Sequence, residues 1–388
     1  MNRKLIGAAA LWTFSMLAHA QSSVTLYGLL DEGVSYANHV TTSTGPSSKV
    51  FYGSGVAGGD RWGLRGQEDL GGGLKAVFVL ENGFSASTGA LGQGGALFGR
   101  QAFVGLSKDG IGAVTFGRQY VLSQTFVGND FSAGGLTALG NYGFHPNDLD
   151  MFTSSRVNNA VKLSSANYAG FRFGAMYAFS NQAGSFQGSL PTTTPVNAGA
   201  SSAYSFGSHY ANGPFAIGIA YTSINFPSAA APAYPVTIAN VNTNGLRRTN
   251  TFGVGAGYTI GPVHVFGNYT DTHLQPVAGT QSTVQTGELG ATYLITPALQ
   301  ATLDDAYTKL SGAFNGRWNQ INSALSYSLS KSTAVYVLAI YQKASGSNLV
   351  NHVVIPVQAS IGSSSTFVAT SAGANNQFVG RVGLQVRF

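Results

Sequence analysis

From Val24 onward the chain consists of stretches of about ten residues in which apolar side chains alternate with small or polar ones. The alternation is clearest at residues 251–260, where Phe, Val, Ala, Tyr and Ile take every second position and Thr or Gly the positions between them. It recurs at residues 171–179 and 378–388. A period of two with one apolar face is typical of β-strands that bury one face. The sequence therefore predicts an all-β fold.

The connections between these stretches alternate between short and long. The short ones are tight turns at residues 69–72, 108–110, 166–170, 212–213, 260–261, 296–297 and 330–331. The long ones are Ser-, Thr-, Asn-, Pro- and Gly-rich segments near residues 38–58, 85–96, 120–155, 181–201, 226–248, 274–283, 311–317 and 345–374. Seven turns and eight loops make fifteen connections, which join sixteen strands. Short turns on one rim, long loops on the other and an even strand number predict an antiparallel barrel that spans an outer membrane.

Composition favours such a membrane barrel over a soluble protein. Charged residues make up 9% of the chain, whereas a typical soluble domain carries about 25%. Glycine accounts for 52 of the 388 residues. A soluble β-sandwich would share the strands, but its loops need not sort so regularly and its core faces would hold fewer Tyr and Phe residues. The chain has no Cys, which excludes thiol catalysis and Cys-based metal sites.

The first twenty residues have the features of a cleaved export signal. Arg3 and Lys4 precede a short apolar run at residues 5–17, and Ala18-His19-Ala20 forms a small-x-small cleavage site. No later segment reaches the 18 or so apolar residues of a transmembrane helix. We therefore expect a signal peptide at residues 1–20 and a barrel domain at residues 21–388. Without the signal the net charge is +4, because 18 basic residues face 14 acidic ones. No basic run suggests nucleic acid as a partner.

The alternation stops over residues 120–155, which carry Asp130, Asp148, Asp150 and several Gly residues. A structureless segment of this length inside a compact domain is usually functional. We expect it to lie inside the barrel and to control passage through it.

Two strands depart from the simple pattern. Residues 333–341 are apolar on both faces, and residues 299–307 place Asp305 on the apolar face. A subunit contact or a β-bulge would account for either departure, and the sequence leaves both explanations open.

Several segments together resemble the general porins of Gram-negative outer membranes, in particular their β-proteobacterial branch. They are SVTLYG at 23–28, RWGLRGQEDLGGGLKA at 61–76, LFGRQAFVGL at 97–106, FGRQY at 116–120, RVNN at 156–159 and the terminal Phe388. Because they occur from residue 23 to the last, the resemblance covers the whole chain after the signal. It implies a sixteen-stranded transmembrane β-barrel that forms a homotrimer, with the third long loop, about residues 120–155, folded into the lumen.

The resemblance also implies a pore constriction in which wall arginines face an acid on the inward loop. The matching wall positions are Arg61, Arg100 and Arg156, with Arg65 and Arg118 nearby. The family usually has a Pro-Glu-Phe-Gly-Gly-like loop motif, where this chain has DFSAGG at 130–135. Asp130 is therefore the candidate loop acid, and Asp148 and Asp150 would equally serve as turn formers.

Strand parity supports part of this assignment independently. If Trp62 and Leu64 face lipid, Arg61 and Arg65 face the lumen, since barrel residues alternate between the two sides. The same reasoning directs Arg156, Lys162, Lys75 and Glu81 inward. Parity is neutral for Arg100, which only the family pattern places in the lumen.

The implied function is passive diffusion of small hydrophilic solutes and ions through a water-filled channel, without a cofactor, a metal or catalysis. Rings of Arg favour anions, so we expect an anion preference. A substrate-specific channel for a sugar or an organic acid would have the same architecture. An exported β-rich adhesin is the alternative from another class.

Enzyme signals are weak. The histidines after the signal show no metal-ligand spacing, no Gly-x-Ser-x-Gly elbow stands out, and the glycines at 71–73 fit a tight turn rather than a phosphate loop. The expected partners are outer-membrane lipid and lipopolysaccharide, small ions and solutes, and two further copies of the chain. The barrel assembly machinery is also expected to bind, because the final strand ends on the aromatic Phe388 in a manner that resembles its recognition signal.

Overall fold

The computed structural model describes residues 23–150, 155–179, 202–225, 246–276, 279–350, 352–363, 367–368 and 372–388. The expected signal peptide, residues 1–20, lies outside these ranges. The strands are β1 (Ser23–Thr42), β2 (Gly45–Ser54), β3 (Arg61–Gly71), β4 (Leu74–Gly83), β5 (Gln101–Lys108), β6 (Gly112–Tyr120), β7 (Arg156–Ser165), β8 (Phe171–Ala178), β9 (Ser202–Asn212), β10 (Phe215–Asn225), β11 (Leu246–Ile260), β12 (Val263–Pro276), β13 (Ser282–Leu294), β14 (Leu299–Gly312), β15 (Gly316–Ser328), β16 (Thr333–Ser345), β17 (Ser347–Val350), β18 (Val353–Pro356) and β19 (Asn376–Arg387). Among the described residues, no helix has the length and apolar character needed to cross a membrane.

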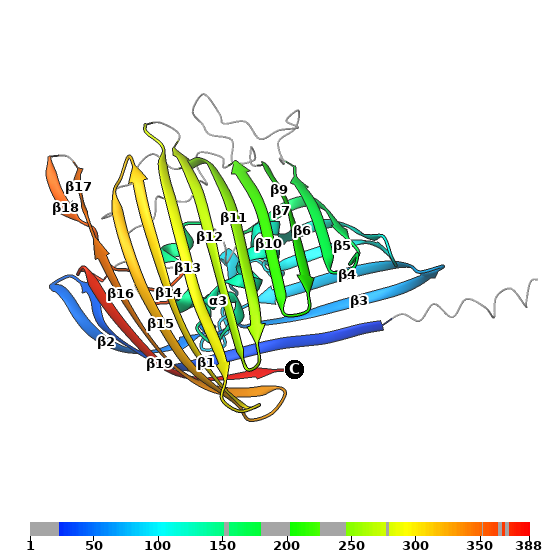
Figure 1. Cartoon of the computed structure of the whole chain (residues 1–388), viewed down its shortest axis with the longest axis horizontal. Coiled ribbons are helices and arrows are strands. Elements are labelled where there is room, and N and C mark those ends of the chain that lie inside the picture. The colour runs from blue at the N-terminus through cyan, green and yellow to red at the C-terminus, as the bar shows by residue number, and fades with distance from the viewer. Residues whose placement is uncertain are drawn as a thin grey trace, which may run out of the picture.

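The strands form one closed antiparallel barrel (Figure 1). Each strand from β3 to β16 pairs with the next, β16 pairs with β19, and β19 pairs with β1. The two strands β2 and β3 pair with different halves of the same edge of β1. They therefore occupy one position in the wall, interrupted at residues 55–60, and the predicted sixteen-stranded barrel is confirmed.

The order of short and long connections is also confirmed, with one exception. All seven predicted tight turns separate consecutive strands, and the long segments that the structure describes alternate with them along the chain, while the segments predicted at 181–201 and 226–248 lie wholly or mostly outside the described residues. The predicted loop at residues 38–58 is wrong in large part, because β1 continues to Thr42 and β2 begins at Gly45. Backbone hydrogen bonds extend this hairpin, and they do not require an apolar face. Its Ser- and Thr-rich sequence therefore lacks the apolar alternation that predicts a strand. The loop at 345–374 likewise contains a small hairpin of β17 and β18.

The apolar face of each strand points outward. On β14, Leu303 and Tyr307 are exposed on the outer surface, while Asp304 and Thr308 are buried on the inner one. Asp305 shares the outer face, where its carboxylate accepts a hydrogen bond of 2.7 Å from Asn319 on β15. An apolar exterior with a polar interior is the arrangement of a barrel in lipid.

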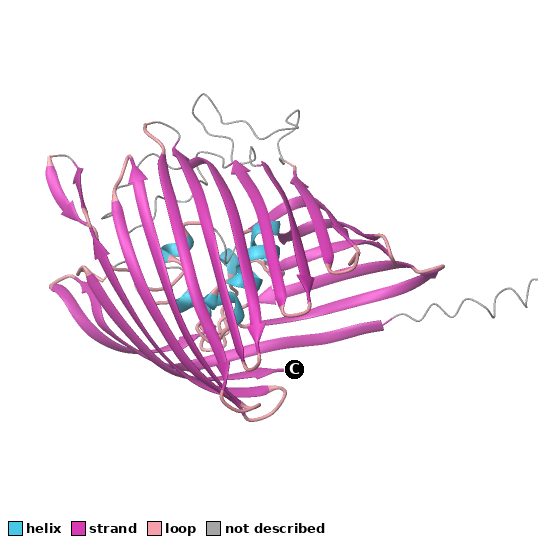
Figure 2. Ribbon diagram, in the orientation of Figure 1, coloured by secondary structure: helices cyan, strands magenta, loops and turns pink. Residues whose placement is uncertain are grey.

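Residues 121–150, hereafter the third loop, carry short helical segments, which the strands enclose (Figure 2). These are η2 (Gln124–Gly128), α2 (Asn129–Phe131), α3 (Ala133–Leu136), α4 (Gly140–Gly143) and η3 (Pro146–Asp148). A further helical turn, η1 (Gln93–Gly95), follows β4.

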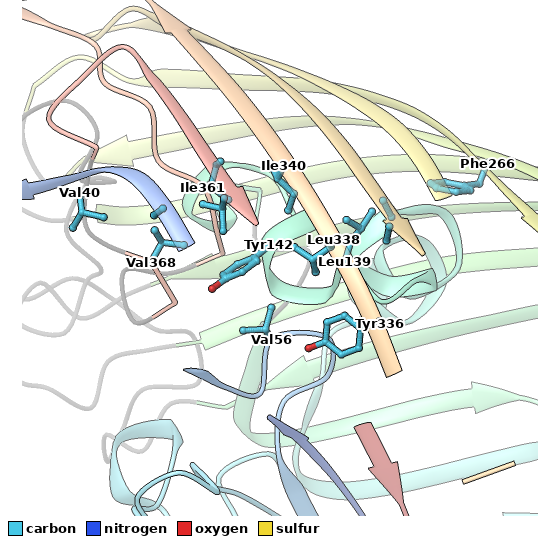
Figure 3. Packing of buried hydrophobic residues seen from close by; sticks show 14 residues of the cluster. Val40, Val56, Leu139, Tyr142, Phe266, Tyr336, Leu338, Ile340, Ile361 and Val368 are labelled. Atoms are coloured by element: carbon cyan, nitrogen blue, oxygen red, sulfur yellow. The ribbon is translucent and has the colours of Figure 1, made fainter. Parts of the chain in front are cut away.

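The main hydrophobic cluster lies between the third loop and the wall (Figure 3). Leu139 and Tyr142 of the loop belong to it, together with Leu338 and Ile340 of β16. Tyr336 on the same inner face of β16 is also a member. The apolar inner face of residues 333–341 is thus explained by loop packing, and neither a subunit contact nor a bulge is required for it.

Candidate functional site

The third loop is fixed to opposite sides of the barrel. Where the loop leaves β6, the backbone N–H of Leu122 donates to Ser205 Oγ on β9 at 2.9 Å. Further along the loop, the N–H of Asn141 donates to the carbonyl of Val56 at 2.7 Å. Tyr142 Oη lies 3.0 Å from Ser35 Oγ on β1. The segment therefore crosses from the β9 side of the wall to the β1 side.

Two glycines allow the loop backbone to approach the wall closely. A Cβ atom on Gly218 of β10 would lie 2.0 Å from the carbonyl oxygen of Phe126 in the loop. On the loop itself, Gly140 has a φ of +49°, and a Cβ there would lie 2.1 Å from the carbonyl oxygen of Val56. Neither position accepts a larger residue without displacing the backbone.

A buried histidine ties the end of the third loop to the wall. His145 Nδ1 is paired with Asp150 of the same loop, and His145 Nε2 lies 3.0 Å from Glu288 Oε2 on β13. Glu288 also accepts a bond of 2.6 Å from the N–H of Ala133. Asp150 accepts one of 2.9 Å from Thr270 on β12. One wall carboxylate thus holds two separate points of the loop.

The charge states of His145 and Asp150 follow from their surroundings. Burial alone lowers the pKa of His145, but the carboxylates of Asp150 and Glu288 outweigh burial and hold that pKa well above its usual value. Burial has the largest single effect on Asp150 and raises its pKa, but the charge and hydrogen bond of His145 and the hydrogen bond from Thr270 together outweigh burial, and the pKa falls below its usual value. The clamp therefore holds a charged imidazolium between carboxylates at neutral pH.

Two of the predicted wall arginines meet at one tyrosine on the inner surface. Tyr120 Oη accepts a hydrogen bond of 2.9 Å from Arg100 and one of 2.5 Å from Arg156. The guanidinium of Arg156 also lies 4.4 Å from the centre of the Tyr120 ring. Arg100 Nε donates to Glu81 Oε1 at 2.7 Å.

Arg61 joins this group at a cavity of about 360 Å³ between the wall and the third loop. Arg61, Arg100, Arg156 and Tyr120 line one side of the cavity, and loop residues that include Asn129 and others from Gln124 to Phe144 line the other. The structure therefore brings together the three matching wall positions, which are far apart in the sequence.

The other predicted site residues lie elsewhere. Arg65 is exposed on the same face of β3 as Arg61, 5.4 Å from the Tyr27 ring, and does not line the cavity. Asp130 also lies outside it, because its Oδ2 is 3.4 Å from His209 Nε2 on β9. Burial raises the pKa of Asp130, against the opposing effect of His209 and Arg172. The acid that the structure brings to the arginines is Glu81, which parity had placed on the inner face.

Asp148 and Asp150 have different surroundings from each other. Asp148 ends the short helical turn η3 with a φ of +52°, which fits a turn-forming role. Asp150 is part of the clamp with His145. Lys162, on the inner face as predicted, donates to the carbonyl of Tyr120 at 3.0 Å.

Sequence reasoning missed the contribution of the eighth loop. Residues 357–363 fold back inside, where the N–H of Ser360 donates to Gln342 at 2.6 Å and Ser363 Oγ to Asn141 at 2.9 Å. Ser363 and Phe367 line the arginine cavity opposite the wall. The apolar residues of this Ser-rich segment, such as Ile361, were the one available signal.

A group of three or more side chains able to hold a metal ion is absent from the described residues. The arrangement presents positive charge and polar backbone to a cavity rather than a reactive centre.

Comparisons with known proteins agree with this architecture. The family model described as Gram-negative porin matches residues 7–347. An outer membrane porin protein of Bordetella pertussis is 35% identical over 244 residues, which are 58% of this chain and 60% of the relative. Outer membrane porin protein 32 of Delftia acidovorans is 38% identical over 182 residues, 46% of this chain and 50% of the relative. The chain thus spans half to three fifths of the length of these relatives.

Two solved structures share the fold. The anion-selective porin from Comamonas acidovorans has a TM-score of 0.73 and 24% identity, and the match covers 95% of this chain and 100% of that one. OmpT of Vibrio cholerae has a TM-score of 0.64 and 15% identity, with 95% and 98% covered.

Proposed function

The chain belongs to the Gram-negative porin family, and we propose that it forms a water-filled channel for passive diffusion of small hydrophilic solutes and ions, with a preference for anions. Its named relatives are outer membrane porins, and the chain is an outer-membrane protein like them. The family is one of channels rather than enzymes.

The arginine cavity is the observation that carries this proposal. Arg61, Arg100 and Arg156 contribute three positive charges to this cavity. The carboxylate of Glu81 contacts one of them, Arg100. Positive rings in a pore favour anions. We place the constriction here, between these wall residues and the third loop, residues 121–150. At low salt a fixed charge is felt over about 10 Å, so every ion that passes this level meets the arginine field.

A second cavity continues the positive path toward the rim of short turns. Its volume is about 380 Å³, and Arg61 lines it together with Lys331 and Arg387. The remaining described lining is rich in Ser and Thr hydroxyls, and no Asp or Glu belongs to the described lining of either cavity. Short turns face the periplasm in barrels of this kind. An anion that leaves the constriction would therefore remain among cations until it reaches the periplasmic mouth.

Several further assignments are part of the same proposal. The porin from Comamonas acidovorans with the same fold is anion-selective, which supports the same preference in this chain. We assign residues 1–20 as a cleaved export signal and the assembly as a homotrimer. Phe388 would present the C-terminal signal to the barrel assembly machinery, and the outer wall would contact lipid and lipopolysaccharide.

The test is a planar bilayer held across a potassium chloride gradient. We expect a zero-current potential of the sign for anion preference at low salt. The preference should decline as salt approaches 1 M, where the screening length is about 3 Å. Cation preference of the unmodified channel would exclude the arginine filter, and an absence of conductance would exclude the channel itself.

A further inference from the structure

The outer surface of the barrel carries an unusual pair of cations. Lys309 on β14 and Arg317 on β15 are directly opposite each other in the strand register. Both are exposed and face outward, because Thr308 and Leu310 beside Lys309 and Gly316 and Trp318 beside Arg317 are buried inside. Like charges that oppose each other on one face of a sheet destabilise it. A negative charge bound nearby would relieve this repulsion.

A third cation adds to this pair. Lys343 on β16 is exposed and lies opposite Asn319, which is two residues along β15 from Arg317. Among the described residues, none of these three cations forms a hydrogen bond or an ion pair with another side chain.

The acids on the same face are engaged by other partners. Asp271 lies 2.8 Å from His273 and accepts a bond of 2.9 Å from Gln285, the residue opposite Lys309 on β13. Asp305 accepts its bond from Asn319. The protein itself thus leaves the charge of the cluster uncompensated.

The position of the three cations along the barrel wall indicates which kind of anion would bind them. Tyr307 is exposed at the next outward position below Lys309 and Tyr341 at the next below Lys343, with Ile321 directly opposite Tyr341 and Leu303 further down β14. Aromatic side chains of this kind mark the boundary between hydrocarbon and headgroups. Lys309 lies near the end of β14 that is opposite the short turn at 295–298, hence near the extracellular rim. The three cations are at the level of the outer-leaflet headgroups.

We propose that Lys309, Arg317 and Lys343 form a binding site for the phosphates of the lipid A headgroup of lipopolysaccharide. Arg binds phosphate through two parallel hydrogen bonds, and Lys adds a mobile point charge. One lipid with two phosphates would bridge three adjacent strands and remove the repulsion between Lys309 and Arg317. The site rests on the proposed contact of the outer wall with lipopolysaccharide, and it is independent of solute passage through the pore.

The experiment titrates the purified full-length protein, freed of lipid in mild detergent, with bisphosphoryl lipid A and follows bound lipid by native mass spectrometry. We expect the double variant Lys309→Gln, Arg317→Gln to bind at least about tenfold more weakly, because two charge-assisted contacts are lost. The control is the double variant Lys108→Gln, Lys331→Gln, which removes two cations at the opposite rim, Lys108 half-buried and Lys331 exposed, and should bind lipid A as the unmodified protein does.

Binding of dephosphorylated lipid A to the unmodified protein tests the role of the phosphates. This lipid keeps the acyl chains, so equal binding of both lipids to the unmodified protein would overturn the proposal, as would unchanged affinity in the Gln variant. Phosphatidylglycerol tests the source of the phosphate, and binding as tight as that of lipid A would refute an outer-leaflet site. Unchanged conductance of the Gln variant would show that the barrel is folded and the channel intact, which separates this result from any failure of the channel proposal.

Discussion

Tyr120 is a neutral residue that holds three cationic side chains of the inner wall in place. Its hydroxyl oxygen accepts bonds from Arg100 and Arg156, while its backbone carbonyl accepts one from Lys162. Because a hydroxyl carries no charge, it fixes two guanidinium groups without neutralising them. A carboxylate in its place would hold the same cations and cancel part of their field.

The selectivity filter can be tested one residue at a time. Changing Arg100 or Arg156 to Glu reverses a charge at the proposed constriction, so the zero-current potential should shift toward cation preference. Lys343→Glu is the matched control, because Lys343 faces outward and its charge is separated from the lumen by the wall. The measurement is the reversal potential in a tenfold salt gradient. An equal shift in all three variants, or no shift in either Arg variant, would mean that the filter lies elsewhere.

At the scale of an element, the third loop depends on a buried charge pair. His145, Asp150 and Glu288 fix its last turn, and Asp304 on β14 is the next acid beyond Glu288. Removing one partner of a buried ion pair leaves the other charge uncompensated. The loop position should therefore respond to pH at its anchored end.

His145→Gln should lower the free energy of unfolding by about 3 kcal/mol near pH 6. The imidazole has a raised pKa in the folded protein, so its contribution is complete below about pH 6.5, the unfolded value, and is lost as pH rises through the folded pKa. Asp150 has a lowered pKa, so its contribution is present above about pH 3.9 and is lost as pH falls through its folded pKa. The difference between variant and unmodified protein should shrink toward alkaline pH.

The measurement is urea unfolding in detergent at several pH values, with current fluctuations in a bilayer as the readout of loop motion. His273→Gln is the control, because His273 pairs with Asp271 at 2.8 Å on the half-exposed outer face, where such pairs contribute at most about 1 kcal/mol. A pH-independent difference for His145→Gln would show that the imidazole acts by packing alone.

The last strand closes the barrel through its final residue. Phe388 donates its N–H to the carbonyl of Gly28 at 3.1 Å and accepts from the N–H of Gly28 at 2.9 Å. Its ring occupies the place of a side chain at Gly28, where a Cβ would lie 2.2 Å away. Phe388 thus completes the contact between β19 and β1.

Deleting Phe388 should lower the amount of protein inserted in the outer membrane, because both the proposed assembly signal and this final pairing are lost. Fractionation with surface labelling measures the inserted amount, and Phe378→Ala on the same face of β19 serves as control. Normal levels of folded, surface-exposed protein after the deletion would refute the role of the terminal aromatic.

At the scale of the whole molecule, the outer surface where β1 and β19 meet, hereafter the seam, is apolar, as expected of a contact between subunits. Val34 of β1, Val382 and Leu384 of β19 and Val337 of β16 are exposed side by side in register. The unheated protein should migrate near three times its monomer mass on detergent gels and collapse to monomer on boiling.

Val382→Lys should weaken this trimer more than Leu303→Lys does. Val382 is 65% exposed at the seam and Leu303 is 63% exposed on β14, so the two changes place a charge on equally accessible apolar positions. Native mass spectrometry in mild detergent counts the subunits. A monomer from the unmodified protein, or equal trimer loss in both variants, would argue against an interface at the seam.

The sequence by itself determined the barrel, because strand parity is a local property. Alternation of side chains with a period of two specifies which residues face lipid wherever a strand lies in the sheet. It therefore placed Glu81 and Lys162 inward, and the turn residues set the strand number. Parity gave no direction for Arg100, because this residue precedes the first residue of β5, Gln101, and side chains alternate only within a strand.

Only the tertiary structure decided how the interior is filled. Tyr120, Glu81 and Arg156 meet because three hairpins lie side by side, and His145 reaches Glu288 across 143 residues. Asp130 faces His209 rather than the arginines because the helical turns of the third loop fix its direction. A loop has no repeating pattern that relates sequence position to direction. Its contacts depend on closure of the barrel, which brings strands distant in sequence within hydrogen-bonding distance of one segment.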